Sequence, residues 1–266
     1  MKYGLIHYNA PGDTFEEFLQ YAKETGFDSV EVSIADVWVP DQGEPEAQAE
    51  QAKALLDKYG IAASALSANN DFVQLDEEAI AAQVTRMEQV AKLATIVGAD
   101  CLRTEGGQPK DGVPEDKWAE AIAGCLNRCL DFCEALKVKL AVDNHGYVTN
   151  DPDVMIKMLE LAPSPWVGTN LDTMNYRWWG NELDKIDWIY EQIAPHTFHT
   201  HLKDGTGSRQ NYVGAALGDG EINLKHAVSC LVKSGYKGVW CAEYEGREDT
   251  GVGYAKCLKW MKANCP

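Results

Sequence analysis

Acidic and imidazole side chains recur in the second half of the sequence, each at the end of a short apolar run. Asp143 ends one run and Asp172 the next, and His201 and Glu243 follow in the last two. Three carboxylates and one imidazole suit Mn2+, Co2+ or Mg2+ better than zinc, which prefers thiolates. Without a cation, acids brought together would raise the pKa of at least one of them by mutual repulsion. These four residues are therefore candidate metal ligands, provided that the fold makes them converge.

The elements that carry these residues alternate regularly along the chain. Short apolar runs, typical of strands, are each followed by a longer amphipathic segment, typical of a helix. At the first such helix, Thr14 and Glu17 have capping-box spacing and Gly26 can end the helix. The expected strands are 2–8, 28–34, 61–68, 99–107, 138–146, 166–172, 196–204 and 238–246. The expected helices are 13–27, 45–60, 76–98, 114–136, 151–162, 181–193, 223–235 and 253–263.

Eight strand-then-helix units in succession predict an α/β fold, the (β/α)8 TIM barrel, with all strands parallel. The alternative is a doubly wound open sheet. It is disfavoured because the first strand-to-helix turn, "HYNAPGDT", has no G-x-G-x-x-G phosphate turn. No linker or low-complexity segment interrupts the pattern, so residues 1–266 are expected to form a single domain. In such a barrel the chemistry gathers at the C-terminal ends of the strands, where the four candidate ligands would meet.

The composition excludes several classes of function. A net charge of −17 and a pI near 4.7 would repel phosphate backbones, so no nucleic-acid partner is expected. No apolar run approaches the roughly 20 residues that span a bilayer, and the first residues lack a signal-peptide core, so we expect a soluble cytoplasmic protein without membrane partners. Eight cysteines without a dense loop framework indicate a reducing compartment. Cys125, Cys129 and Cys133 form one helical stripe and are expected to pack in the core.

Five short motifs occur in an order that resembles one known family. They read "AVDNHG", "TNLDTMN", "HTHLKDG", "LGDGEIN" and "AEYEG", with "GFDSVEVS" and "LRTEGG" earlier in the chain. This order is similar to that of the xylose isomerase-like superfamily of TIM barrels, the sugar phosphate isomerase/epimerase group, and the likeness covers essentially the whole chain. The resemblance implies metal ligation by the same four residues. It also implies that His201 is a ligand, that His199 supports it from deeper in the barrel, and that His196 is structural.

The chain departs from the family pattern at one ligand. The strand-five position usually carries Glu, whereas this chain has Asp143, which is one methylene shorter. In the family's epimerases the strand-five and strand-eight glutamates also move the proton on opposite faces of the substrate. Glu243 keeps that role by resemblance, and Asp143 can still bind metal but is a less obvious base. His145, two residues along, becomes the candidate general base because an imidazole accepts and returns protons near neutral pH. The alternative is a structural role, in which His145 only forms a hydrogen bond with a neighbouring acid.

The resemblance also implies the chemistry. Two neighbouring oxygens of a hydroxy-carbonyl sugar chelate the cation, and loss of the adjacent C–H proton gives a metal-bound enediolate. Reprotonation from the opposite face gives an epimer, reprotonation at the neighbouring carbon gives an aldose–ketose isomer, and loss of a leaving group gives lyase or deglycosidase chemistry. Lys203 is expected to contact a substrate oxygen or stabilise the enediolate, and its structural alternative is an ion pair with Asp204 or another acid.

Other polar residues at the strand ends are candidates for contacting substrate. They are His7, Glu31, Arg103, Glu105 and Asn175, together with Trp178, whose ring could form an apolar wall or a subunit contact.

The function predicted from the sequence is a divalent-metal-dependent sugar isomerase/epimerase, with Mn2+ preferred and Mg2+, Co2+ and Zn2+ left open. The first alternative is a metal-dependent lyase or deglycosidase on keto-sugar glycosides, with His145 as base. An abasic-site endonuclease is disfavoured, because it would need more metal ligands and positive charge. A non-catalytic sugar-binding barrel is disfavoured by the complete ligand set. The expected partner is a small-molecule carbohydrate, and a homo-oligomer is left open.

Overall fold

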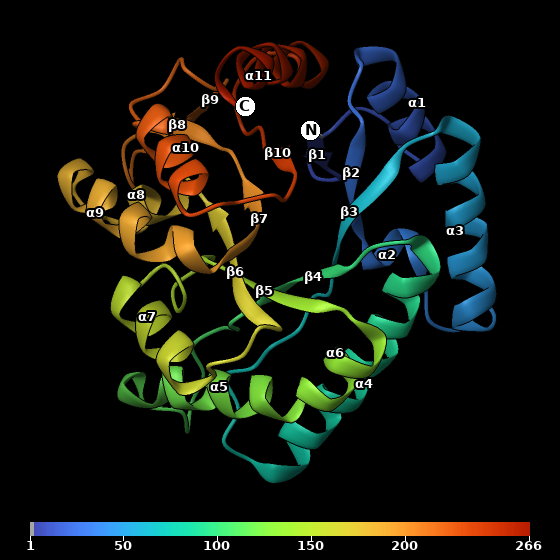
Figure 1. The fold of residues 1–266 in the computed structure, drawn as a ribbon, viewed down its shortest axis with the longest axis vertical. Helices are drawn as coiled ribbons and strands as arrows, with labels where there is room; N and C mark the ends of the chain where they lie inside the picture. Colours follow the sequence, from blue (N-terminus) through green and yellow to red (C-terminus); the bar gives the residue numbers. More distant parts are fainter. Residues whose placement is uncertain (1–2) are drawn as a thin grey trace.

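Eight parallel strands form the centre of the computed structural model, which describes residues 3–266. They follow the order β10-β1-β2-β3-β4-β5-β6-β7 (Figure 1). The sheet closes between β7 and β10, where Leu202 N–H donates to the Cys241 carbonyl at 2.7 Å and Glu243 N–H to the Leu202 carbonyl at 2.9 Å. The predicted single-domain (β/α)8 barrel is thereby confirmed. The strands are β1 (Tyr3–Ile6), β2 (Ser29–Ser33), β3 (Ala62–Ser67), β4 (Cys101–Glu105), β5 (Lys139–Asp143), β6 (Val167–Asp172), β7 (Thr197–His201) and β10 (Trp240–Ala242).

Helices surround the strands as an outer ring (Figure 1). The predicted capping box begins α1, because the Thr14 hydroxyl accepts the Glu17 N–H at 3.2 Å while the Glu17 carboxylate accepts the Thr14 N–H at 3.1 Å. Gly26 ends this helix at φ 95°, a left-handed conformation that glycine adopts without strain. The helices are α1 (Phe15–Thr25), α2 (Ile34–Val37), α3 (Pro45–Tyr59), α4 (Glu77–Val97), α5 (Trp118–Arg128), α6 (Leu130–Leu136), α7 (Pro152–Leu161), α8 (Asn175–Trp179), α9 (Leu183–Ile193), α10 (Leu224–Lys233) and α11 (Thr250–Asn264), with 3-10 turns η1 (Glu115–Lys117) and η2 (Ala194–His196).

The structure differs from the sequence prediction in three segments. The helix expected over 114–136 is divided at Cys129, whose N–H bonds the Leu126 carbonyl three residues back and tightens the turn. Short helices α2 and α8 occupy two strand-to-helix loops. The segment after β7 forms an unpredicted antiparallel hairpin of β8 (Asp204–Thr206) and β9 (Val213–Ala215). All three additions, α2, α8 and the hairpin, lie in loops at the C-terminal strand ends and therefore shape the rim of the barrel.

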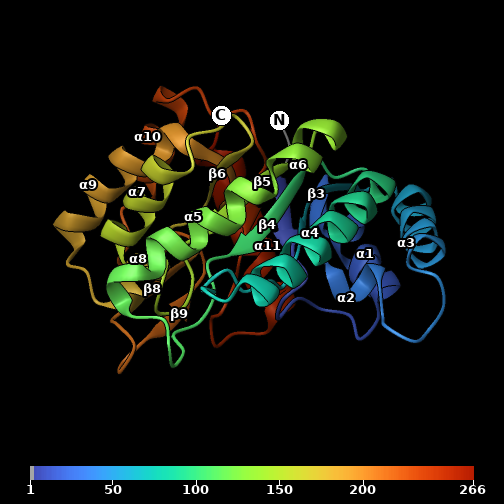
Figure 2. The same cartoon turned by 90° about the horizontal axis from the view of Figure 1, so that it is seen from below.

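The rim that carries the strand C-termini is the lower side in Figure 2, where the β8–β9 hairpin and α8 project. The C-terminus of the chain lies on the opposite, upper side. All eight cysteines are free and buried, and the Cys125, Cys129 and Cys133 stripe packs in the core as predicted. Within residues 3–266, no helix is both long and apolar enough to cross a membrane.

Candidate active site

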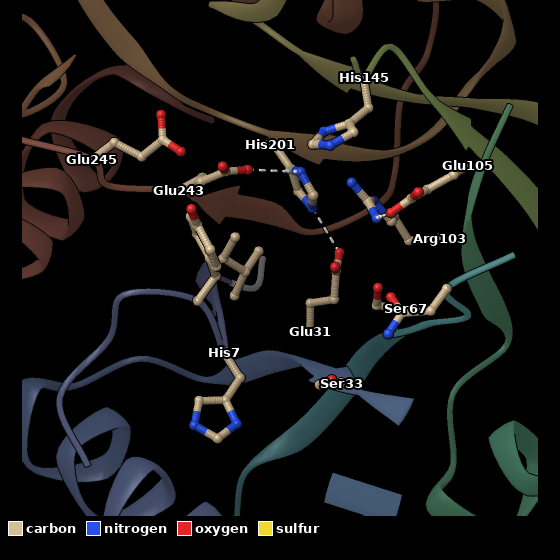
Figure 3. Close-up of a pocket in the computed structure, with 13 residues that line it drawn as sticks. His7, Glu31, Ser33, Ser67, Arg103, Glu105, His145, His201, Glu243 and Glu245 are labelled. Atoms are coloured by element: carbon tan, nitrogen blue, oxygen red, sulfur yellow. Dashed lines mark hydrogen bonds and ion pairs between the residues drawn. The ribbon is translucent and has the colours of Figure 1, made fainter. Parts of the chain in front are cut away.

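A cavity of about 340 Å³ opens at the C-terminal ends of the strands. Strand ends from both halves of the barrel contribute to its wall (Figure 3). Of the residues predicted to do chemistry or contact substrate, the cavity is lined by His7, Glu31, Arg103, Glu105, His145, His201 and Glu243. The cavity therefore lies where the barrel architecture places active sites.

Three of the four predicted metal ligands converge beside this cavity. The ligand atoms of Asp172, His201 and Glu243 all lie within 4.8 Å of one another, and all three residues are buried. Asp172 Oδ1 accepts the N–H groups of Met174 and Asn175, each at 2.8 Å, which fixes the carboxylate. Within the described chain, Asp172 Oδ2 and His201 Nδ1 have no hydrogen-bond partner. Buried polar atoms without partners are costly, and here they belong to groups that bind divalent cations, so this cluster fits a metal ion.

His201 is oriented by Glu31, which reaches it from the opposite side of the barrel (Figure 3). The distance from His201 Nε2 to Glu31 Oε2 is 2.7 Å, and a carboxylate only accepts hydrogen bonds, so Nε2 carries the proton. Nδ1 then faces Glu243, whose Oε2 lies 3.1 Å away. His199, predicted to support His201, instead bonds Asn170 Oδ1 at 2.9 Å and lies 3.4 Å from Glu31. The support from His199 therefore runs through Glu31.

Lys203 is buried among acids rather than paired with Asp204. Its ammonium lies 2.7 Å from Glu243 Oε1, 2.9 Å from Glu245 Oε2 and 3.9 Å from Asp172 Oδ2. The Lys203 ammonium also donates a hydrogen bond to the Asn175 side-chain oxygen at 3.4 Å. Lys203 thus bridges the predicted ligand cluster and a second carboxylate at the rim.

Asp143, the fourth predicted ligand, has other partners in this structure. Both Arg103 Nη2 and Nε bond its Oδ2, the latter at 3.1 Å, and Asn170 donates to its Oδ1 at 2.6 Å. Arg103 also donates to Glu105 at 2.7 Å. The shorter side chain of Asp143 therefore ends in an ion pair with the neighbouring strand.

Burial and these charges pull the pKa values of the cluster apart. Burial raises the pKa of Asp172 to about 8, and the nearby Glu243 and Asp143 carboxylates act in the same direction against Lys203. Burial would also raise the pKa of Glu243, but Lys203 and His201 outweigh it and hold that pKa well below its usual range. Burial lowers the pKa of His201, yet Glu31 and Glu243 raise it well above the ordinary value.

The other predicted site residues take varied positions. His145 lines the cavity with 45% of its side chain exposed, and its Nδ1 lies 3.7 Å from Asp143 Oδ2. His7 bonds Asp36 at 2.6 Å and stacks on Phe18. Trp178 packs edge-on against Tyr147 and, like Asn175, is not among the residues that line the cavity.

Sequence reasoning did not assign a role to several residues that line the cavity, among them Tyr8, Ser33, Ser67, Asn69 and Glu245. Ser33 and Ser67 end β2 and β3, so the strand-end rule that selected the acids would also have found them. Glu245 falls within the strand expected over 238–246, two residues beyond Glu243, so the same rule would have found it as well.

Comparisons with known proteins agree with this architecture. A family model described as "Xylose isomerase-like TIM barrel" matches residues 19–264. A protein of Escherichia coli O157:H7, named L-ribulose-5-phosphate 3-epimerase UlaE, is 24% identical over 262 residues, which cover 95% of this chain and 90% of that protein. The crystal structure of IolI with a bound zinc atom superposes with a TM-score of 0.79 at 17% identity, covering 99% and 96% of the two chains. D-allulose 3-epimerase from Methylomonas sp. superposes with a TM-score of 0.77 at 16% identity, covering 99% and 98%.

Proposed function

Because the chain belongs to the xylose isomerase-like TIM barrel family, we propose that it is a sugar epimerase or isomerase that depends on a divalent metal. The observation that carries the proposal is the buried cluster of Asp172, His201 and Glu243, in which Asp172 Oδ2 and His201 Nδ1 make no hydrogen bond within the described chain. The names of the relatives support the same class, because two of the three reported above are sugar 3-epimerases. None of the three is named as a lyase.

Asp172, His201 through Nδ1, and Glu243 would hold the metal, for which we propose Mn2+. Asp143 would be the fourth ligand, and then either Arg103 would have to release its Oδ2 or Asn170 its Oδ1. When bound, a divalent ion polarises the substrate carbonyl and makes the neighbouring C–H proton easier to remove. The IolI structure with zinc supports a metal in this fold.

The protein's own residues would move the proton. His145 lines the cavity close to the proposed ligands and has the exposure needed to reach substrate, so we assign it the role of general base. Glu243 would serve the opposite face of the substrate. Lys203, which already lies 2.7 Å from Glu243, would stabilise the negative charge that develops on a substrate oxygen. Return of the proton to the opposite face gives an epimer, and return to the adjacent carbon gives an isomer.

Solvent exchange tests the shared first step. Mn2+-loaded protein is incubated in D2O with ketoses, aldoses and their phosphate esters, and deuterium at the carbon next to the carbonyl is followed by NMR. We expect exchange with at least one sugar and its loss after chelation of the metal. Exchange that is unchanged after complete metal removal would rule out the metal-dependent mechanism.

Anomalous scattering from crystals of the Mn2+-loaded protein tests the ligand assignment. We expect one ion within about 2.0 to 2.6 Å of Asp172, His201 and Glu243. The same map shows whether Asp143 joins them as the fourth ligand or keeps its ion pair with Arg103. An ion bound elsewhere, with this cluster empty, would contradict the assignment.

A further inference from the structure

We infer that the substrate is an uncharged sugar rather than its phosphate ester, and that Glu105 and Glu245 make this distinction. The inference rests on the proposed sugar epimerase function and adds the substrate class. It runs against the phosphorylated substrate named for the Escherichia coli relative. Two observations support it. The cavity wall is negatively charged, and carboxylates of the chain itself already accept the backbone N–H groups around the cavity.

The cavity wall is negative because its fixed cations already have carboxylate partners. Arg103 is held by Asp143 and Glu105. Lys203, directly behind the wall, is held by Glu243 and Glu245. A phosphate dianion entering the cavity would have to compete with buried carboxylates for these cations, and like charges placed side by side are strongly unfavourable.

Glu105 and Glu245 lie on opposite sides of His201 in the cavity (Figure 3). Their side chains are 23% and 21% exposed, so each is partly open to a ligand. Arg103 contacts Oε1 of Glu105, while Tyr212 and Lys203 contact Oε2 of Glu245. In the described chain, each carboxylate keeps its second oxygen without a side-chain hydrogen bond. An ionised carboxylate only accepts hydrogen bonds, so these oxygens match the hydroxyl donors of a sugar and reject the oxygens of a phosphate.

The backbone amides that could receive a phosphate at the rim are already used by a carboxylate of the chain. In TIM barrels, phosphate is frequently bound by the loops after strands seven and eight. Here the Asp204 carboxylate, just beyond β7, accepts the N–H groups of Gly205 at 2.8 Å, Gly218 at 2.9 Å, Gly220 at 3.1 Å and Ile222 at 3.2 Å. This internal anion occupies the amide cluster from within.

Two helix N-termini at the same rim are occupied in the same way. Asp76 accepts the Ala79 N–H at the start of α4, and Asp249 accepts the Val252 N–H at the start of α11. Helix N-termini are favourable anion sites, and these two already hold a carboxylate. A phosphate at either position would meet a negative charge instead of free N–H groups.

Two exposed arginines near the rim, Arg209 and Arg247, are the alternative contacts for a phosphate group that extends out of the cavity, and the test includes them for that reason. Arg209 lies over the Tyr147 ring, 5.0 Å from its centroid, and neither arginine lines the cavity. If a phosphate group extended out of the cavity to these side chains, their removal would weaken its binding. Under the inference, their removal leaves the preference for the uncharged sugar unchanged.

Binding is measured first with unreactive polyols, so that turnover plays no part. The Mn2+-loaded protein is titrated calorimetrically with D-glucitol and with D-glucitol 6-phosphate. We expect the uncharged polyol to bind at least about tenfold more tightly. One unfavourable contact between the phosphate and a carboxylate is enough to produce a difference of this size. Equal or tighter binding of D-glucitol 6-phosphate by the wild-type protein would overturn the inference. If the Arg209→Gln/Arg247→Gln variant then lost this binding, the two arginines would be the residues that hold the phosphate.

Glu105→Gln and Glu245→Gln keep the shape of each side chain but remove its charge. We expect each variant to reduce the difference in affinity between D-glucitol and D-glucitol 6-phosphate, whereas the Arg209→Gln/Arg247→Gln variant leaves this difference unchanged. A difference of wild-type size in both glutamine variants would overturn the assignment to these residues. Solvent exchange of D-fructose and D-fructose 6-phosphate separates the two proposals: preferential binding of the uncharged polyol with no exchange of any sugar would reject the epimerase function and retain the charge preference.

Discussion

At the scale of single residues, the central feature of the site is that the two ring nitrogens of His201 face two different carboxylates. Its Nε2 is fixed by Glu31 and its Nδ1 is directed toward Glu243, so one imidazole joins the far side of the barrel to the proposed ligand cluster. The hydrogen-bond partner of one ring nitrogen sets which nitrogen can bind a metal. Glu31 would therefore act on a bound metal through His201, in addition to the substrate contact predicted from the sequence.

Replacement of Glu31 by Gln tests this arrangement. The amide keeps the size of the side chain but loses the negative charge that holds the His201 Nε2 proton. We expect Mn2+ affinity to fall about 10- to 100-fold, the range found for partners that orient a metal-bound histidine. Metal affinity is measured by competition with a chelator, and circular dichroism checks the fold. Wild-type affinity in a folded variant would show that Glu31 does not orient the ligand.

His145→Ala tests the general base. The side chain is nearly half exposed and is absent from the metal cluster, so the variant should keep its Mn2+ while solvent exchange falls by at least about 100-fold. Metal content and deuterium exchange are measured on the same sample. His196→Ala, exposed in η2 at the start of β7, is the matched control and should change neither. Full metal with wild-type exchange would return the role of base to Glu243.

At the scale of elements, the close approach of β6 to β7 aligns the ligands they carry. Asp172 and His201 are paired residues in the register of these strands. Near the other end of β6, Gly168 lets the two strands approach closely: a Cβ there would lie 2.3 Å from the His196 carbonyl oxygen and 2.6 Å from the Phe198 ring. The absence of a side chain at Gly168 is therefore a condition of the strand packing that supports the site.

Gly168→Ala should destabilise the protein by about 1 to 3 kcal/mol, because the added methyl group overlaps backbone that cannot move freely. The matched control is Gly124→Ala in the exposed face of α5, where a Cβ would meet nothing within 4 Å. That change should be neutral or stabilise by about 0.5 to 1 kcal/mol, because alanine favours the helix. Urea unfolding of both variants measures the difference. Equal stabilities would contradict the close approach of β6 and β7.

At the scale of the whole molecule, the net charge is −17, and two of its carboxylates are buried together in the proposed metal cluster. Asp172 and Glu243 lie within the same cluster, and burial keeps the pKa of Asp172 near 8. A divalent cation would compensate the repulsion between these carboxylates, and its binding to the native state alone would stabilise the fold. Ligand chemistry and global stability are therefore linked through one site.

Thermal unfolding with and without metal measures this link. Mn2+ at 100 times its dissociation constant should add about 2.7 kcal/mol to the free energy of unfolding, and a chelator should remove the increment. Asp172→Asn should lose most of the increment, because one ligand no longer carries charge. An unchanged melting temperature in saturating Mn2+ would show that the native state has no metal site of this kind.

The sequence alone determined the barrel and much of its rim. Alternation of apolar runs and amphipathic segments requires parallel strands, and parallel strands bring their C-terminal ends to one rim. That is why Asp172, His201 and Glu243 can be grouped from the sequence alone. The capping box at Thr14 was equally readable, because it depends only on local spacing.

Only the tertiary structure decided which partner each polar group has. Arg103 on β4 reaches Asp143 on β5, and Glu31 bonds His201 from 170 positions away in the chain. Asp204 occupies backbone amides of a loop that begins 14 residues later. Periodicity fixes the face on which a side chain lies. It does not fix the competition among nearby donors and acceptors, which depends on distances of a few tenths of an ångström between strands that are distant in sequence.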